Sequence, residues 1–232
     1  MNENLKKWLP LIVVFVVLLI GLLISKNSLP TLKVEKEVVD ISKVNEIVKM
    51  LSDENEKKNA QSALDELYKD KTKDDTYYLV SARIIMENGN DVDAVGTLNN
   101  VKNRNEEYYK LMVRSTSGEF FTMGRVPDSL LNTAIEAANK YTDNIDFQLL
   151  TGKLFYDKDN YTGALYYLDK TLQIDDKNVD ANYYYALNIY LLGEQEEGIS
   201  YMEKAQKLYK GDDKEYKNSM SNYISIMKEG KR

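Results

Sequence analysis

Apolar and polar residues follow each other along most of the chain with the period of an amphipathic helix. From Asp40 onward apolar positions recur every three or four residues, and no run shows sustained strand alternation. Breaking and capping residues interrupt the pattern and leave segments of about 12 to 16 residues. The breaks fall at Ser52-Asp53, Asp74-Asp75, Gly89-Asn90-Asp91, Pro127-Asp128, Asp143, Asp159, Asp175-Asp176, Gly193 and Gly211-Asp212-Asp213. The pattern therefore predicts an all-α protein built from short helices.

Small and bulky residues recur within this pattern at a spacing of 34 residues. The two clearest copies contain, in order, Gly152, Phe155, Ala164, Leu168 and Thr171, and then Ala186, Ile189, Gly198, Met202 and Ala205. An earlier pair of copies contains Val48, Leu51, Ala60, Leu64 and Leu67, and then Ala82, Ile85, Ala94, Leu98 and Val101. Between the two pairs, after a two-residue insertion, stand Gly118, Phe121, Leu130, Ala134 and Ala137. A period of this length indicates a helical hairpin that is repeated and stacked.

The spacing resembles the tetratricopeptide repeat (TPR), a helix–turn–helix unit with small residues at positions 8, 20 and 27 and large ones at 11 and 24. The resemblance covers about residues 41–212, which corresponds to five units. The sequence departs from the family at position 4, where Gln148 and Asn182 replace its tryptophan. It departs again at position 32, where Asp176 and Lys210 replace its proline. We therefore expect residues 41–232 to form a divergent TPR-like α-solenoid.

Steric fit explains why small residues recur. Two antiparallel helices approach closely only where Gly or Ala leaves room, as we expect for Gly152 with Ala164 and for Ala186 with Gly198. Bulky neighbours then fill the gap to the next unit, because a single hairpin cannot bury its apolar face alone. A last helix, predicted over residues 214–228, would cap the stack. Its apolar positions are Tyr216, Met220, Tyr223, Ile224 and Met227.

The amino-terminal region contains a run without charge, LPLIVVFVVLLIGLLI, at residues 9–24. At about 1.5 Å per residue a helix of this length covers roughly 24 Å, and Trp8 and Ser25 bring it near the lower limit for a membrane span. We expect an uncleaved transmembrane helix at residues 9–25, after a head at 1–8 and before a tether at 26–40 rich in lysine and acidic residues. The alternatives are a cleaved signal peptide, for which Leu23-Ile24-Ser25 is a poor exit, and a buried core helix.

The orientation of this helix is not decided by charge, because basic residues are nearly balanced across it. Lys6 and Lys7 precede it, and Lys26, Lys33 and Lys36 follow it. A short head is easily left in the cytoplasm, and a long domain can be translocated regardless of its charge. We therefore expect a single-pass protein of a cell membrane with its amino terminus inside and its domain extracytoplasmic. Richness in Lys, Asn, Ile and Tyr is typical of a low-GC bacterial genome.

Composition removes several kinds of chemistry. The chain has neither cysteine nor histidine, so it lacks thiolate ligands, cysteine nucleophiles, the commonest general base and the commonest metal ligand. Its net charge is −6 and its basic residues are scattered among acidic ones, which does not favour nucleic-acid binding. We expect neither a cofactor nor enzymatic activity.

Two short matches to catalytic or metal-binding patterns are better explained by structure. Ser225 and Lys228 fit Ser-x-x-Lys, but no companion motif is present and a lysine-rich chain produces such matches by chance. Residues 157–161 begin like a calcium loop, but Gly163 comes one place late and the twelfth position is Leu168. A turn between paired helices is the simpler interpretation.

The TPR resemblance implies a concave groove lined by positions 2, 5, 9 and 12 of the first helix of each unit. Tyrosine suits such a surface, because it buries a large area at low entropic cost and keeps a hydrogen-bonding end. The partner-binding residues that this register selects are Arg83, Lys153, Tyr156, Tyr183, Leu187 and Tyr190, with Lys217 from the capping helix. The alternative for each tyrosine is that it only completes the packing. The Lys/Asn/Asn/Lys/Arg set with which some TPR cochaperones clamp a carboxyl-terminal peptide is missing, so that ligand is not implied.

The sequence thus favours a membrane-anchored scaffold or adaptor that binds a protein or peptide partner in an envelope or secretion-related assembly. The anchor would confine the groove to the membrane surface and raise the local concentration of the partner. The alternative is structural self-assembly into homo-oligomers through an exposed apolar end of the stack.

Overall fold

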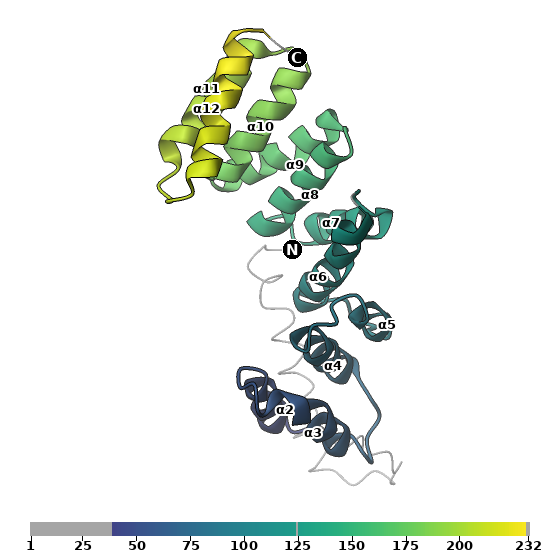
Figure 1. Ribbon diagram of the computed structural model, residues 1–232. Coiled ribbons are helices and arrows are strands. Elements are labelled where there is room, and N and C mark those ends of the chain that lie inside the picture. Colours follow the sequence, from purple (N-terminus) through teal and green to yellow (C-terminus); the bar gives the residue numbers. More distant parts are fainter. Residues whose placement is uncertain (1–38, 124, 231–232) are drawn as a thin grey trace, which may run out of the picture. The chain divides into compact units, whose positions relative to one another are not determined.

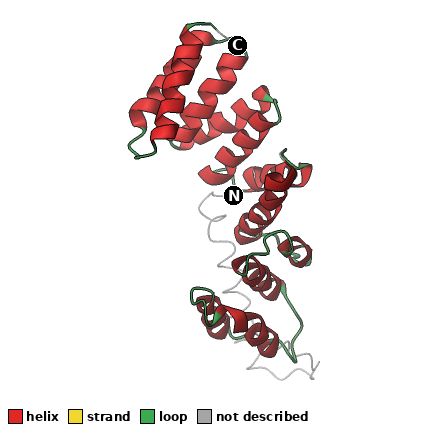
Figure 2. Ribbon diagram, in the orientation of Figure 1, coloured by secondary structure: helices red, strands yellow, loops and turns green. Residues whose placement is uncertain are grey.

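The computed structural model describes residues 39–123 and 125–230, and within them the chain forms helices and connecting turns without a strand (Figures 1 and 2). The predicted head, membrane span and most of the tether lie outside these residues. Among the helices that are described, none combines the length and apolar character that crossing a membrane requires. The exposure of Gly118 and Phe121, two of the predicted repeat positions, is likewise not described.

The helices form consecutive hairpins, each packed against the next along the chain (Figure 1). The pairs are α2 (Ile41–Met50) and α3 (Ala60–Leu67), α4 (Asp75–Glu87) and α5 (Ala94–Leu98), α6 (Glu106–Met123) and α7 (Asp128–Lys140), α8 (Ile145–Asp157) and α9 (Tyr161–Ile174), and α10 (Val179–Leu191) and α11 (Gln195–Leu208). A 3₁₀ turn, η1 (Lys57–Asn59), precedes α3, and α12 (Lys214–Lys228) follows the last pair. The prediction of an all-α, TPR-like hairpin repeat is confirmed.

Short polar side chains begin the helices, as the breaks in the sequence indicate. Asn144, Asn160 and Asn178 accept hydrogen bonds from main-chain N–H groups in the first turns of α8, α9 and α10. Each side chain thereby satisfies donors that have no partner within the helix. The turn after α10 contains Gly193 with φ of 107°, a left-handed conformation that glycine adopts without strain. These residues help to fix where α8, α9 and α10 begin and where α10 ends.

Small residues stand where the helices of a hairpin approach each other. A Cβ atom added to Gly152 would lie 2.7 Å from the Cγ atom of Leu168, and one added to Gly198 would lie 3.1 Å from the carbonyl oxygen of Ala186. Ala164 of α9 is also fully buried. The predicted role of small residues at close helix contacts is therefore confirmed, although Gly152 makes way for Leu168 rather than for Ala164.

Buried amides occupy the positions where the TPR family has tryptophan. Gln148 donates to the carbonyl oxygens of Ala138, at 2.7 Å, and Thr142, at 3.3 Å. Asn182 donates to those of Asp176, at 3.0 Å, and Asn178, at 2.7 Å. Both side chains are fully buried, and their own amide oxygens have no partner among the described residues. The amides thus tie the turn that precedes a unit to the first helix of that unit.

The core near the carboxyl terminus is formed jointly by α10, α11 and α12. Met202, Met220 and Met227 are fully buried there, together with Ala186 and Ala205. The bounds of α12 agree with the predicted capping helix of residues 214–228. Packing of α12 on the last hairpin covers the face that a further unit would otherwise bury.

The amino-terminal hairpins depart from the regular unit. The helix α5 is far shorter than the 12 to 16 residues that the spacing of breaks indicates, and α6 is longer. Val39, which the sequence assigns to the tether, is buried in the core of the first hairpin, and Asp40 caps α2 by accepting from the N–H of Ser42. Val39 and Asp40 therefore belong to the structured domain.

Candidate functional site

A cluster of tyrosines joins the first helices of the last two hairpins to α12. We call Tyr156 of α8, Tyr183 and Tyr184 of α10, and Tyr216 and Tyr223 of α12 the tyrosine cluster. The ring centroids of Tyr156 and Tyr184 are 5.5 Å apart, and those of Tyr183 and Tyr184 are 5.2 Å apart. Tyr183 also lies 5.4 Å from Tyr216 and 6.0 Å from Tyr223. These separations are typical of favourable aromatic pairs, so the rings hold the three helices in a fixed relation.

A carboxylate and an ammonium group connect the same three helices. Asp180 of α10 accepts a hydrogen bond from the Tyr216 hydroxyl at 2.8 Å and forms an ion pair with Lys153 of α8 at 3.1 Å. The Lys153 ammonium also lies 4.9 Å from the centroid of the Tyr184 ring. One charged pair thus bridges α8, α10 and α12, and it places a cation against a tyrosine face.

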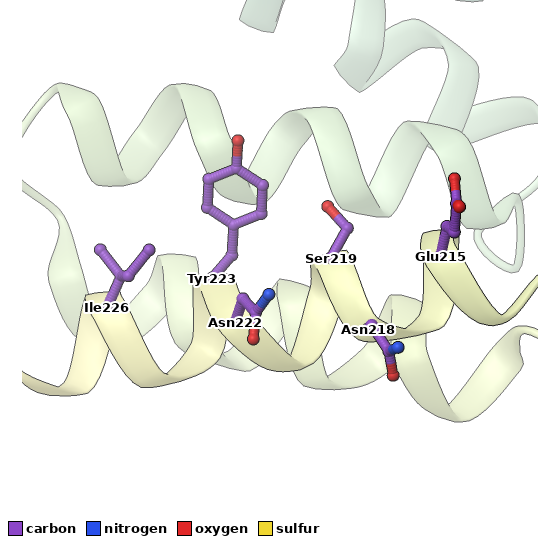
Figure 3. A pocket seen from close by; sticks show the side chains of 6 residues that line it. All are labelled: Glu215, Asn218, Ser219, Asn222, Tyr223 and Ile226. Atoms are coloured by element: carbon purple, nitrogen blue, oxygen red, sulfur yellow. The ribbon is translucent and has the colours of Figure 1, made fainter.

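The inner edge of α12 forms an open depression beside the cluster. Glu215, Ser219, Tyr223 and Ile226 project from one side of the helix and line it together with Asn218 and Asn222 (Figure 3). The hydroxyl oxygens of Ser219 and Tyr183 are 3.3 Å apart, and this contact connects the depression to α10. The surface combines aromatic rings, amides, hydroxyls and one carboxylate, a mixture suited to non-covalent recognition.

Burial favours the protonated form of four tyrosines of the cluster, Tyr156, Tyr183, Tyr184 and Tyr216. Burial, aided by neighbouring phenols, raises the pKa of Tyr156 to about 12. Burial also raises the pKa of Tyr183 and of Tyr184. The pKa of Tyr216 is raised by burial first and then by its hydrogen bond to Asp180. Each hydroxyl can therefore donate as well as accept a hydrogen bond.

The residues selected by the TPR register fall into three groups. Lys153 and the half-buried Tyr156 belong to the site and remain partly exposed. Tyr183, Leu187 and Tyr190 are only 8%, 5% and 6% exposed, because they pack in the core shared with α12. Whether these three contact a partner stays a prediction, but they offer little surface to one.

Arg83 and Lys217 lie away from the tyrosine cluster. Arg83 is exposed on α4, in an earlier hairpin. Lys217 has helical spacing to Ser221 and Lys228, which contact Gln206 and Glu203 of α11 at 2.7 and 2.8 Å. Lys217 therefore lies on the side of α12 that faces α11, whereas Ser219 and Tyr223 lie on the side that faces α10.

The sequence analysis did not select Tyr184, Tyr216, Ser219 or Tyr223 as partner-binding residues. Tyr184 lies one place after a groove position of the TPR register, and the two α12 tyrosines read as apolar positions of a cap. The available signal was the run of three tyrosines at 183–185 on one helix. Three consecutive residues of a helix point in different directions, so they cannot all face the closely packed core. At least one of the three rings therefore lies at its edge.

Comparisons with known proteins agree with the fold. The chain matches no protein-family profile and no curated protein sequence. It is similar to the structure of YrrB, described as a TPR protein with an unusual peptide-binding site, with a TM-score of 0.62 and 14% identity over 82% of this chain and 93% of YrrB. It is also similar to MamA structures. One has a TM-score of 0.58 and 17% identity over 76% of this chain and 97% of MamA, and another has 0.55 and 18% over 66% and 89%.

Proposed function

We propose that this protein is a scaffold that binds a protein or peptide partner through the tyrosine cluster and the depression beside α12. The observation that carries the proposal is the convergence of tyrosines from α8, α10 and α12 next to an open, mixed polar and apolar surface. Tyrosine is among the residue types that most often contribute strongly to affinity at protein interfaces. YrrB, which has a similar fold and is described as having an unusual peptide-binding site, supports the same use of this architecture. We propose no catalytic activity.

We further propose that residues 9–25 anchor the scaffold in a bacterial cell membrane with its domain outside. The support is the length of the uncharged run and the interfacial position of Trp8. Resistance of the full-length protein to alkaline extraction would show that it is integral to the membrane. Digestion of the domain by protease added to spheroplasts would show that it is extracytoplasmic, whereas protection in intact spheroplasts would contradict the orientation.

Site-specific photo-cross-linking in the native host tests the binding proposal. A photoreactive phenylalanine derivative replaces Tyr156 or Tyr184, and Tyr166 of α9 serves as the matched control. Tyr166 is 56% exposed, and its nearest aromatic partner is Tyr167 rather than a ring of the cluster. We expect the same partner at both cluster positions and a much lower yield at Tyr166. Equal yields at all three positions, or products at Tyr166 alone, would refute the proposal.

Self-association is the second candidate function, because the first hairpin has a groove of its own. Ile47, Met50, Ala63 and Leu67 form its apolar floor. Its rim carries both signs of charge, on Lys43, Lys71, Glu46, Glu56 and Glu66. A surface of this kind can be complementary to a second copy of itself. Light scattering on the full-length protein in detergent, compared with a Met50→Glu variant, separates the two candidates: only self-association predicts an oligomer that the substitution dissociates.

A further inference from the structure

The charges around the tyrosine cluster are unbalanced in favour of carboxylates. Lys153 is the basic residue at this site, and Asp180 already neutralises it at 3.1 Å. Asp157, on the same stripe of α8 as Lys153, and Glu215 at the depression form no ion pair among the described residues. Lys217 projects toward α11, whereas Lys214 stands one helical turn before Asn218, at the amino-terminal end of the depression. In the part of the chain that the structure describes, Asp157 and Glu215 thus have no ion-pair partner of their own near the half-buried rings, although the charge of Lys153 partly offsets the effect of burial on the pKa of Asp157.

The contact of Lys153 with Tyr184 shows how this surface can receive a cation. An ammonium group 4.9 Å from a ring centroid lies within the range of a cation–π interaction. Tyr156 and Tyr223 are half-buried rings of the same cluster that carry no such cation in the described structure. Asp157 lies close to Tyr184, since its charge adds to burial, the larger cause, in raising the pKa of that phenol. The rings of the cluster and the Asp157 carboxylate are thus close enough to contact the same bound cation.

We propose that the partner segment presents a lysine or arginine side chain to this surface, with its cation against the rings of Tyr156 and Tyr223 and paired with Asp157. The inference rests on the proposed binding function and adds the chemistry of the partner. Aromatic rings and carboxylates both favour a cation, and neither favours an acidic guest. Lysine and arginine also carry apolar stems that can cover Ile226 at the edge of the depression.

Binding of matched peptides to the full-length protein in neutral detergent tests this chemistry. The probes are fluorescein-labelled 12-residue peptides with blocked ends, uncharged apart from one central position that is lysine, arginine, norleucine or glutamate. Fluorescence anisotropy gives each dissociation constant at low and at physiological salt. We expect lysine and arginine peptides to bind at least about 5-fold more tightly than norleucine, from one exposed ion pair and one cation–π contact, with glutamate weakest.

Two variants with the same change in net charge locate the effect. Asp157→Asn should remove most of the lysine preference. Asp70→Asn, in the exposed turn after α3, should leave it unchanged. Equal affinities of the lysine and norleucine peptides, including no measurable binding of either, would overturn the proposal, as would equal effects of the two substitutions. Photo-cross-linking at Tyr184 does not depend on the charge of the partner, so capture there with no lysine preference would leave the scaffold function standing and remove only this inference.

Discussion

Replacement of Gly152 by alanine tests the packing rule on which the fold depends. The new Cβ atom would lie 2.7 Å from Cγ and 2.9 Å from Cδ2 of the fully buried Leu168, and 3.3 Å from the main-chain nitrogen of Leu168. The Cγ atom cannot move away without displacing the whole side chain, because it is the branch point rather than a flexible end. The surrounding helices α8 and α9 must therefore shift apart.

Two opposing effects set the size of the change, and Gly96 separates them. Alanine in place of glycine within a helix contributes up to about 1 kcal/mol of stability, whereas overpacking a filled core costs about 1–3 kcal/mol. An alanine Cβ at Gly96, which is exposed in α5, would meet no atom within 4 Å. We expect Gly152→Ala to destabilise by about 1 kcal/mol and Gly96→Ala to stabilise by about 0.5 kcal/mol.

Urea unfolding followed by circular dichroism at 222 nm measures this contrast. For a slope of about 2 kcal/mol per M, the two midpoints should differ by roughly 0.8 M. Stacked repeats can unfold in more than one step, so the transition is also followed by near-ultraviolet tyrosine signals, which report on tertiary packing around the rings. A Gly152→Ala midpoint equal to or above that of Gly96→Ala would refute the claim that close helix contact requires a small residue at this position.

Three further changes probe the site and the buried amides. Asp180→Ala removes the partner of both Lys153 and Tyr216 and should lower the free energy of unfolding by about 1 kcal/mol in urea titrations. The loss is no larger because both contacts are partly exposed. Asp70→Ala is the control and should leave the stability unchanged. Raising the pH from 10 to 12 should destabilise the fold, because the pKa of Tyr156 is about 12 when folded and about 10 when unfolded. The contribution of Tyr156 is complete below pH 10, and unfolding midpoints that stay constant to pH 12 would contradict it. Asn182→Ala removes the donor to two carbonyl oxygens and should lower the free energy of unfolding by about 2 kcal/mol. Thermal unfolding measures this loss, and a loss below about 0.5 kcal/mol would show that the amide does not hold the turn against the helix.

The regular part of the fold was predictable because its spacing reflects local sterics. Small residues such as Gly152 and Ala186 recur wherever two helices touch, and the bounds of α12 follow from its cap and its apolar stripe. The short α5 was not predictable, since nothing in the repeat spacing marks the early end of that helix at Leu98. Its length depends on how α4, α5 and α6 pack, which is a tertiary effect.

The site was predictable only in part, because a register says which positions face a groove but not what covers them. Tyr183, Leu187 and Tyr190 occupy groove positions, yet α12 packs against them and leaves each less than a tenth exposed. Tyr223 and Ser219 of α12 line the depression instead. They lie next to α10 but are not covered by it. The rotation of a capping helix about its own axis depends on side-chain fit and not on a repeat that ends before it.

Hydroxyl-radical footprinting of the full-length wild-type protein tests the central claim most directly. It is done with and without the partner that photo-cross-linking identifies, bound non-covalently. The chain has 18 tyrosines, so the method reports on many surfaces in one measurement. Binding through the tyrosine cluster predicts lower oxidation of Tyr156, Tyr184 and Tyr223, with Tyr166 and Ile174 of α9 unchanged. Protection of Tyr166 and Ile174, with the cluster tyrosines oxidised as before, would show that the partner binds elsewhere.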